Sequence, residues 1–178
     1  LDFHLNGDYG LNVFNSRSLA YLKDKELESA CVSFELRFAQ IRDLKKVLRA
    51  EAIVYGRLPL MITENCLVQN ETGCRLDRQG LCVPEDGPCR CGQPNVLVDR
   101  TGAAFPLLPA YGHRTEIQNS KPLYLADRPE HRRLGLAYAR LRFTTETAEE
   151  CVSVVQNYLD AAPAAGDFTR GLYERGVE

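Results

Sequence analysis

The chain has 178 residues, of which 44% are hydrophobic and 26% charged, a composition typical of a globular protein with a sizeable core. Its formal net charge of -2 excludes the overall basic character that non-specific nucleic-acid binding requires. No apolar run reaches the ~18–20 residues of a membrane span, and no signal-peptide pattern opens the sequence. We therefore expect a cytoplasmic protein without a membrane partner. Because the sequence begins without Met in a strand-like segment, we also expect it to be part of a longer protein.

Short apolar runs in the first part of the chain predict strands. They lie at residues 10–14, 30–36 and 51–56, and the second is continuous and rich in β-formers, as expected for a buried strand. A helical pattern separates each run from the next. Strand, helix, strand, helix, strand along the chain is typical of a parallel sheet. We therefore expect residues 1–62 to form a βαβαβ unit.

Two helices are predicted between these strands. The first begins after Asn15 or Ser16, since both residue types cap helix N-termini. The second runs to about Arg49. Its apolar residues fall on one face: Phe38, Ile41, Leu44 and Leu48.

Residues 63–178 break this alternation and form a second region. A cysteine-rich loop at 63–92 precedes a hairpin predicted over 95–108, which turns through Asp99-Arg100-Thr101-Gly102. Residues 114–128 combine β-formers with a proline, so they predict an edge strand or an extended arm. Another segment with alternating apolar residues lies at 134–143.

The clearest helix pattern begins at Thr147. Thr147 and Glu150 have the spacing of a capping box. An apolar stripe follows on one face, which we expect to face the core: Ala148, Cys151, Val152, Val155 and Leu159. Cys151 on this stripe, like Cys31 inside a predicted strand, is therefore expected to be a packed core residue and not a ligand.

Four motifs together resemble one family. They are NGDYGLNVFNS (6–16), SFELRFAQIRDL (33–44), YGRLPLMITENC (55–66) and FTRGLYERGVE (168–178). In this combination they resemble the C-terminal half of the collagenase-like peptidase family U32. LVDRTGAAFPL and RTEIQNSKPLYLADR fit the same pattern, so the resemblance spans nearly the whole chain.

This resemblance implies an α/β fold made of the C-terminal βα units of a TIM-like (β/α) barrel. A Cys-bearing, β-rich extension with a C-terminal helix follows these units, and the N-terminal half of the barrel is expected to lie outside the chain. Family members are described as peptidases without a settled catalytic type. Others take part in oxygen-independent hydroxylation of RNA bases or of a quinone precursor, with an iron–sulfur cluster on cysteines.

No peptidase motif accompanies the resemblance. His4, His113 and His131 are the only histidines, and neither HExxH nor G-x-S-x-G occurs. Active sites of barrels lie at the C-terminal ends of strands, which makes Asn15, Glu35 and Arg57 the candidate catalytic residues. Glu35 and Arg57 could hold an anionic substrate, or they could form a structural salt bridge at the barrel rim.

The stretch 64–92 contains five of the seven cysteines: Cys66, Cys74, Cys82, Cys89 and Cys91. Without an export signal we expect a reducing compartment, where clustered cysteines bind metal more often than they form disulfides. No CxxC pair occurs, so the usual zinc-ribbon spacing is missing. Incidental small apolar residues and disulfides are the alternatives.

The expected metal ligands are Cys66, Cys74, Cys89 and Cys91, with Cys82 and His113 as alternates. Cys89 and Cys91 can reach one metal from a tight turn. In the family a further cysteine commonly precedes the R-x-E-I stretch, where this chain has His113. An iron–sulfur cluster and zinc are therefore both candidate cofactors, and a nitrogen ligand favours zinc.

Three kinds of function are compatible with these observations. The first is a family enzyme, either a peptidase or a cluster-dependent factor that hydroxylates RNA or a small molecule. The second is a zinc-stabilised binding module, and the third is a structural fragment that is inert without its N-terminal half. The substrate would then be a peptide, an RNA or a small molecule. Free strand edges also predict self-association of the chain.

Overall fold

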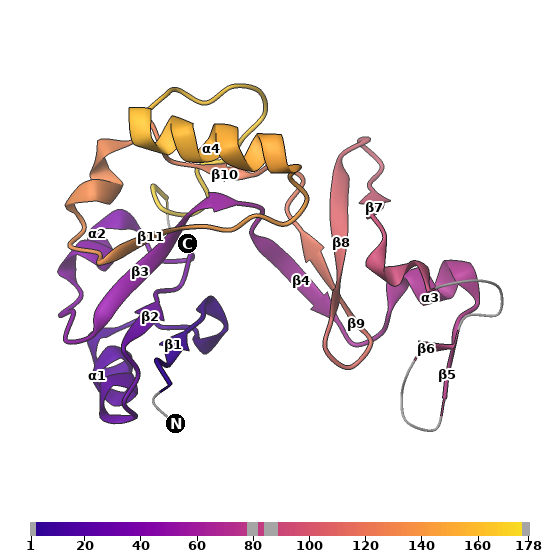
Figure 1. The fold of residues 1–178 in the computed structure, drawn as a ribbon, viewed down its shortest axis with the longest axis horizontal. Helices are drawn as coiled ribbons and strands as arrows, with labels where there is room; N and C mark the ends of the chain where they lie inside the picture. The colour runs from indigo at the N-terminus through magenta and orange to yellow at the C-terminus, as the bar shows by residue number, and fades with distance from the viewer. Residues whose placement is uncertain (1–2, 78–81, 84–88, 176–178) are drawn as a thin grey trace. The chain divides into compact units, whose positions relative to one another are not determined.

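A computed structural model of the protein describes residues 3–77, 82–83 and 89–175 (Figure 1). Its contacts define two compact units. Unit 1 comprises Leu1–Gly56 and Pro122–Glu178, and unit 2 comprises Arg57–Lys121. The sequence pattern predicts one division of the chain, after residue 62, whereas unit 1 is built from two separate segments.

Four parallel strands form most of the sheet of unit 1. They are β1 (Asn6–Gly7), β2 (Ser29–Cys31), β3 (Arg49–Gly56) and β11 (Tyr138–Leu141). β2 pairs with β1 and with β3, and β11 pairs with β3, all in parallel. β10 (Leu123–Tyr124) adds an antiparallel pair at the end of β3. The predicted parallel arrangement is confirmed. The second segment of unit 1 joins the first because both β10 and β11 pair with β3.

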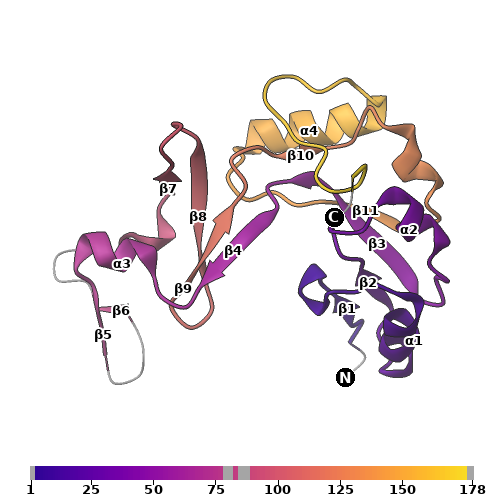
Figure 2. The same cartoon turned by 180° about the vertical axis from the view of Figure 1, so that it is seen from behind.

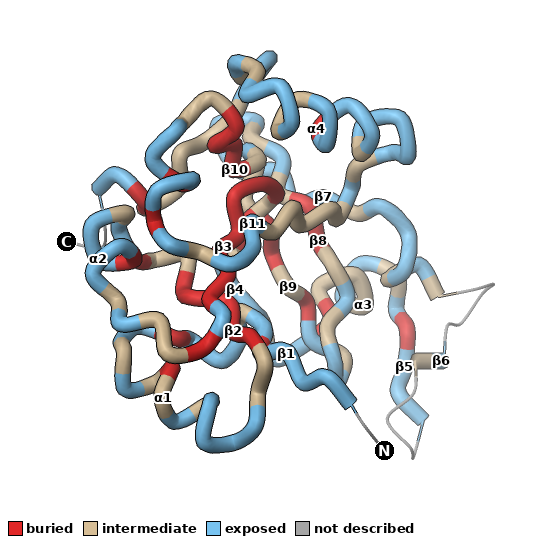
Figure 3. Tube along the Cα trace, turned by 60° about the vertical axis from the view of Figure 1, so that its left-hand side comes forward, coloured by how far each residue is buried: buried red, intermediate tan, exposed pale blue. Residues whose placement is uncertain are grey.

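The sheet described in unit 1 is open. Among the described strands, β1 and β11 are each paired on one side only. The structure therefore shows a mixed α/β fold, with a parallel sheet and helices in unit 1 and an antiparallel sheet in unit 2, and it does not show the barrel. β3 is buried at every position after Arg49, as expected for a strand covered on both faces, and buried residues are concentrated along it (Figure 3).

The strand predicted over 10–14 is wrong in its extent. A short 3₁₀ helix, Tyr9–Leu11, occupies its start, and only Val13 bridges in parallel to Val32. The local polar residues explain this: the Asp8 side chain accepts a hydrogen bond from the amide of Tyr9 at 2.6 Å, and Asn12 adopts a left-handed conformation with φ of 49°.

The next two predicted elements are shorter than expected. β2 ends at Cys31, and residues 34–36 form a turn. α2 spans Phe38–Asp43 and does not reach Arg49, because Leu44 has an extended backbone that ends the helix. Leu44 and Leu48 therefore lie outside the helix. Ile41 lies within it and is buried as expected.

The caps of the two longer helices are confirmed. α1 (Ser16–Asp24) begins after Asn15, whose Oδ1 accepts from the amide of Ser18 at 2.9 Å. α4 (Ala148–Asp160) begins after Thr147, which forms the predicted capping box with Glu150. Among the described residues, no helix is long and apolar enough to cross a membrane.

The face that α4 turns to the core differs from the prediction. Val154 is buried and Tyr158 half-buried, and both pack with Tyr55 and Tyr124. Figure 2 shows α4 running alongside β10. The predicted stripe is largely exposed instead, with exposed fractions of 71% for Val152 and 71% for Leu159. Aromatic packing explains why this other face of α4 is buried, because the Tyr158 ring contacts Tyr55 and Tyr124. The Tyr158 hydroxyl also accepts a hydrogen bond from the amide of Leu125.

Unit 2 contains an antiparallel sheet. Its strands lie in the order β4 (Pro59–Thr63), β9 (Arg114–Gln118), β8 (Ala104–Ala110) and β7 (Asn95–Val98). The predicted hairpin is confirmed as β7–β8, and the Asp99 carboxylate closes its turn by accepting from the amides of Thr101 and Ala103. β9 is central and not an edge strand, because Pro122 lies outside it and leaves its amides free to pair.

Candidate metal centre

Short elements of unit 2 carry the five clustered cysteines. Cys66 is the N-cap of α3 (Leu67–Thr72), and Cys74 follows the C-cap of this helix. Cys82 begins β6 (Cys82–Val83), which pairs with β5 (Arg75–Leu76). Cys89 precedes and Cys91 lies within a 3₁₀ helix, Arg90–Gly92. The sulfur atoms therefore come from four separate pieces of local structure.

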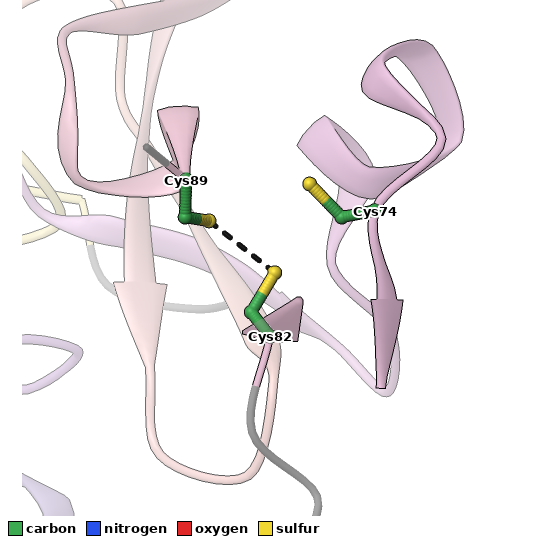
Figure 4. Close-up of side chains that lie close together, drawn as sticks. All are labelled: Cys74, Cys82 and Cys89. Carbon is green, nitrogen blue, oxygen red and sulfur yellow. Dashed lines mark hydrogen bonds between the residues drawn. The ribbon is translucent and has the colours of Figure 1, made fainter. Parts of the chain in front are cut away.

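Three of these sulfur atoms form a compact group. The Sγ atoms of Cys74, Cys82 and Cys89 all lie within 4.8 Å of one another. Figure 4 shows these three side chains coming together from separate segments of the chain. Cys89 Sγ lies 3.3 Å from Cys82 Sγ and 3.0 Å from Cys91 Sγ. Cys91 therefore adjoins the group through Cys89.

The loop that bears Cys66 and Cys74 is fixed by local hydrogen bonds. The Thr115 hydroxyl on β9 accepts from the amide of Leu67 at 3.0 Å and so ties the start of α3 to the sheet. At the other end, Gly73 has φ of 68° and donates its amide to Gln69. Glycine adopts this left-handed conformation without strain, and it ends the helix. Cys74, which follows directly, is buried.

Electrostatics distinguish the thiols within the group. Hydrogen bonding with Cys91 and then with Cys82 lowers the pKa of Cys89 from 9.0 to about 7. The same contact with Cys89, followed by burial, raises the pKa of Cys82 to about 12, and contact with Cys89 likewise raises the pKa of Cys91 to about 11. Without metal, one thiolate at Cys89 is therefore stabilised by its protonated neighbours. A metal ion would take the place of those protons.

The donor chemistry of the group fits a metal. Three mutually close sulfur donors, with a fourth beside Cys89, suit tetrahedral zinc, and cysteine thiolates equally hold iron–sulfur clusters. Among the described residues, no histidine, aspartate or glutamate joins the group. Cys31 and Cys151 lie in unit 1, and burial raises the pKa of Cys31 to about 12, as is typical of an unreactive structural thiol.

The group overlaps with the ligand set expected from sequence. Cys74, Cys89 and the alternate Cys82 belong to it, and Cys91 adjoins it. Cys66 is buried and near enough to Cys91 for its charge to raise the Cys91 pKa. His113 lies between β8 and β9 with φ of 60°.

The candidate catalytic residues have local roles in the fold. Asn15 uses its side-chain oxygen to cap α1. Arg57 donates to the backbone carbonyls of Asn119, at 3.0 Å, and Ser120. Glu35 lies half-buried in the turn after β2. Glu35 belongs to unit 1 and Arg57 to unit 2, and their catalytic pairing stays a prediction.

The fold and the sulfur group define a mixed α/β protein with a candidate metal–thiolate centre. A sequence model of Peptidase family U32 matches residues 1–100, which is more than half of the chain and includes all five clustered cysteines. The chain therefore belongs to Peptidase family U32. No curated protein and no solved structure matches it.

Proposed function

We propose that this member of Peptidase family U32 binds a metal centre through Cys74, Cys82, Cys89 and Cys91. The observation that carries the proposal is the convergence of three Sγ atoms within 4.8 Å of one another, with the fourth 3.0 Å from Cys89. Cysteines that serve only as small apolar residues are not expected to place their sulfur atoms together. The mixed burial of the group, with Cys74 buried and Cys89 half-buried, also suits a metal that enters from solvent.

Four sulfur ligands would limit the role that the metal can have. Zinc that activates water keeps one coordination position open, whereas a set of four thiolates closes the site. The proposed centre therefore stabilises the fold of residues 64–92, or it carries electrons, and it does not itself activate water. For the peptide hydrolysis that the family name describes, the reacting groups would be others, and Asn15, Glu35 and Arg57 are the proposed candidates.

A second candidate function follows from the same donors. An iron–sulfur cluster would fit the all-sulfur group as well as zinc does. The chain would then serve oxygen-independent hydroxylation of an RNA or a small molecule, with the cluster transferring electrons. With zinc, the same centre would instead stabilise a binding module. Metal identity therefore separates these candidates.

Anaerobic purification followed by elemental analysis and visible spectroscopy tests the proposal. We expect bound iron with acid-labile sulfide and a broad visible absorption band for a cluster, or colourless protein with bound zinc. Cys89→Ser should lose most of the metal, whereas Cys151→Ser on α4 should retain it, since Cys151 is outside the group. Protein without either metal, or equal metal content in both variants, would refute the centre.

Activity assays then distinguish the reactions. Cleavage of a denatured collagen substrate by the metal-loaded chain would support peptide hydrolysis, and Glu35→Gln should reduce it while leaving the metal bound. A cluster that can be reduced and reoxidised reversibly, in a chain that does not cleave peptides, would support the electron-transfer role instead.

A further inference from the structure

Two sulfur atoms of the candidate metal centre face each other directly. Cys82 Sγ lies 3.3 Å from Cys89 Sγ, and Figure 4 shows the two side chains pointing toward one another. A disulfide bond is about 2.05 Å long, so the two atoms need to approach by only about 1 Å more to form one. Cys82 belongs to β6 and Cys89 precedes the 3₁₀ helix Arg90–Gly92, so this bond would join two separate elements.

The same two thiols are open to solvent. Cys82 and Cys89 are half-buried, whereas Cys74 is buried. Cys74 Sγ is also held 3.2 Å from the hydroxyl of Thr72. A small oxidant in the solvent therefore reaches Cys82 and Cys89 more readily than Cys74.

Cys91 is a less suitable partner for Cys89 although its sulfur is closer. The two Sγ atoms lie 3.0 Å apart, but only one residue separates Cys89 from Cys91, and the 3₁₀ turn between them is closed by a 3.0 Å bond from the amide of Gln93 to the carbonyl of Arg90. A disulfide across this turn would close a very small ring and distort it. Six residues separate Cys82 from Cys89, so a bond between them closes a larger and less strained ring.

We propose that the Cys82–Cys89 pair makes the zinc form of this centre sensitive to peroxide, because oxidation of the pair to a disulfide releases the metal. The inference rests on the proposed function, since it takes the same four cysteines as ligands. Oxidation leaves only Cys74 and Cys91 as thiolates, which are too few to hold tetrahedral zinc. Residues 64–92 then lose the order that thiolate binding gives them, so the oxidant changes the structure of unit 2.

The oxidant is hydrogen peroxide, and each step is balanced. The Cys89 thiolate attacks one peroxide oxygen, the O–O bond breaks, and the leaving hydroxide takes up a proton to become water. The Cys82 thiolate then attacks the sulfur of the resulting sulfenic acid, the S–O bond breaks, and a second hydroxide leaves as water in the same way. One peroxide and two protons are consumed, one disulfide forms, and zinc leaves as Zn²⁺. A dithiol reductant restores both thiols.

Peroxide titration of the full chain, reduced and loaded with zinc, tests this proposal. A chromogenic chelator measures the zinc released, and we expect about one zinc for each peroxide consumed, in line with the chemistry above. Reduction with a dithiol should let the chain take up zinc again. Cys151→Ser is the control and should release zinc at the rate of the parent chain, because Cys151 lies outside the group.

Peptide mapping without reduction identifies the bonded pair. Trypsin produces the peptide QGLCVPEDGPCR, residues 79–90, which contains both Cys82 and Cys89, whereas Cys91 begins the next peptide. We expect the peptide 79–90 to be two hydrogens lighter after peroxide treatment, with both of its cysteines protected from alkylation. A cross-link between this peptide and the next would identify Cys91 as the partner and would overturn the proposal.

The other outcomes separate this inference from the metal centre itself. A chain that binds zinc and keeps it after peroxide treatment, or that loses zinc while both thiols of 79–90 stay free, overturns the peroxide response and leaves the centre intact. A reduced chain that takes up iron alone does the same. A reduced chain that takes up neither zinc nor iron refutes the centre, and the peroxide response with it.

Discussion

At the scale of single residues, the sulfur group joins cysteines that are close in sequence with Cys82, which a pairing of two short strands brings to them. The spacing identified Cys89 and Cys91 as close neighbours because one residue separates them. The place of Cys82 in the group depends on the pairing of β5 with β6, which involves only two residues in each strand. Such short strands give no periodic signal, so the choice between Cys66 and Cys82 lay beyond sequence reasoning.

Gly56 at the end of β3 is predicted to be intolerant of substitution. It has φ of 118°, and a Cβ built there would lie 2.0 Å from the backbone oxygen of Arg142. We expect Gly56→Ala to lower the free energy of unfolding by roughly 1–3 kcal/mol, the usual cost of such strain, or more. Gly10→Ala, where a Cβ would meet nothing within 4 Å, is the control. Equal urea midpoints for the two variants would contradict this reading.

His131 is predicted to make unit 1 sensitive to acid. Burial lowers its pKa below the ordinary 6.5, although a hydrogen bond with the Arg128 carbonyl opposes this shift. The unfolded chain therefore binds the proton more readily, so this contribution is present above pH 6.5 and is lost as the pH falls below it. Thermal unfolding of His131→Gln should depend less on pH over this range than that of the parent chain. The same slope in both would show that other groups cause it.

At the scale of elements, polar caps were predicted well and apolar faces less well. Asn15 and Thr147 fixed the starts of α1 and α4, because a cap is a local interaction between residues three apart. The buried face of α4 depends on distant partners, the aromatic rings of Tyr55 and Tyr124. Helix α4 has apolar residues on two adjacent faces. Which face is buried depends on the residues from other elements that pack against it.

The cap of α4 gives a prediction at this scale. The Thr147 hydroxyl accepts from the amide of Glu150 at 3.3 Å, and the Glu150 carboxylate accepts from the amide of Thr147 at 2.7 Å. We expect Thr147→Ala to reduce the free energy of unfolding by about 1 kcal/mol. Ser153→Ala on the exposed side of the same helix should be neutral or slightly stabilising. Chemical denaturation with matched baselines compares the two; a neutral Thr147→Ala would mean that tertiary contacts alone hold the helix.

At the scale of the whole molecule, the α/β class could be predicted and the division into units could not. The parallel order of β1, β2 and β3 follows from consecutive strand–helix repeats. The return of β10 and β11 to β3 follows an intervening unit, Arg57–Lys121, and no local pattern encodes a pairing over that separation. Long-range pairing of this kind is decided by the assembled core.

Removal of the metal should affect unit 2 alone. The sulfur group lies within Arg57–Lys121, and unit 1 has its own core around Tyr55, Tyr124 and Val154. After treatment with a chelator we expect trypsin to cleave first after Arg75 and Arg90, because thiolate binding orders the segment that carries them. Mass spectrometry of the early fragments identifies the sites. A cleavage pattern unchanged by the chelator would show that this segment needs no metal.

The most direct test of the metal–thiolate centre is X-ray absorption at the iron and zinc edges of the anaerobically purified chain. We predict a first shell made of sulfur alone, with a metal–sulfur distance of about 2.3 Å for zinc. Four sulfur neighbours per zinc, or sulfur neighbours with a nearby second iron for a cluster, would agree with Cys74, Cys82, Cys89 and Cys91 as the ligands. A shell of nitrogen and oxygen, or a chain with neither metal, would contradict it.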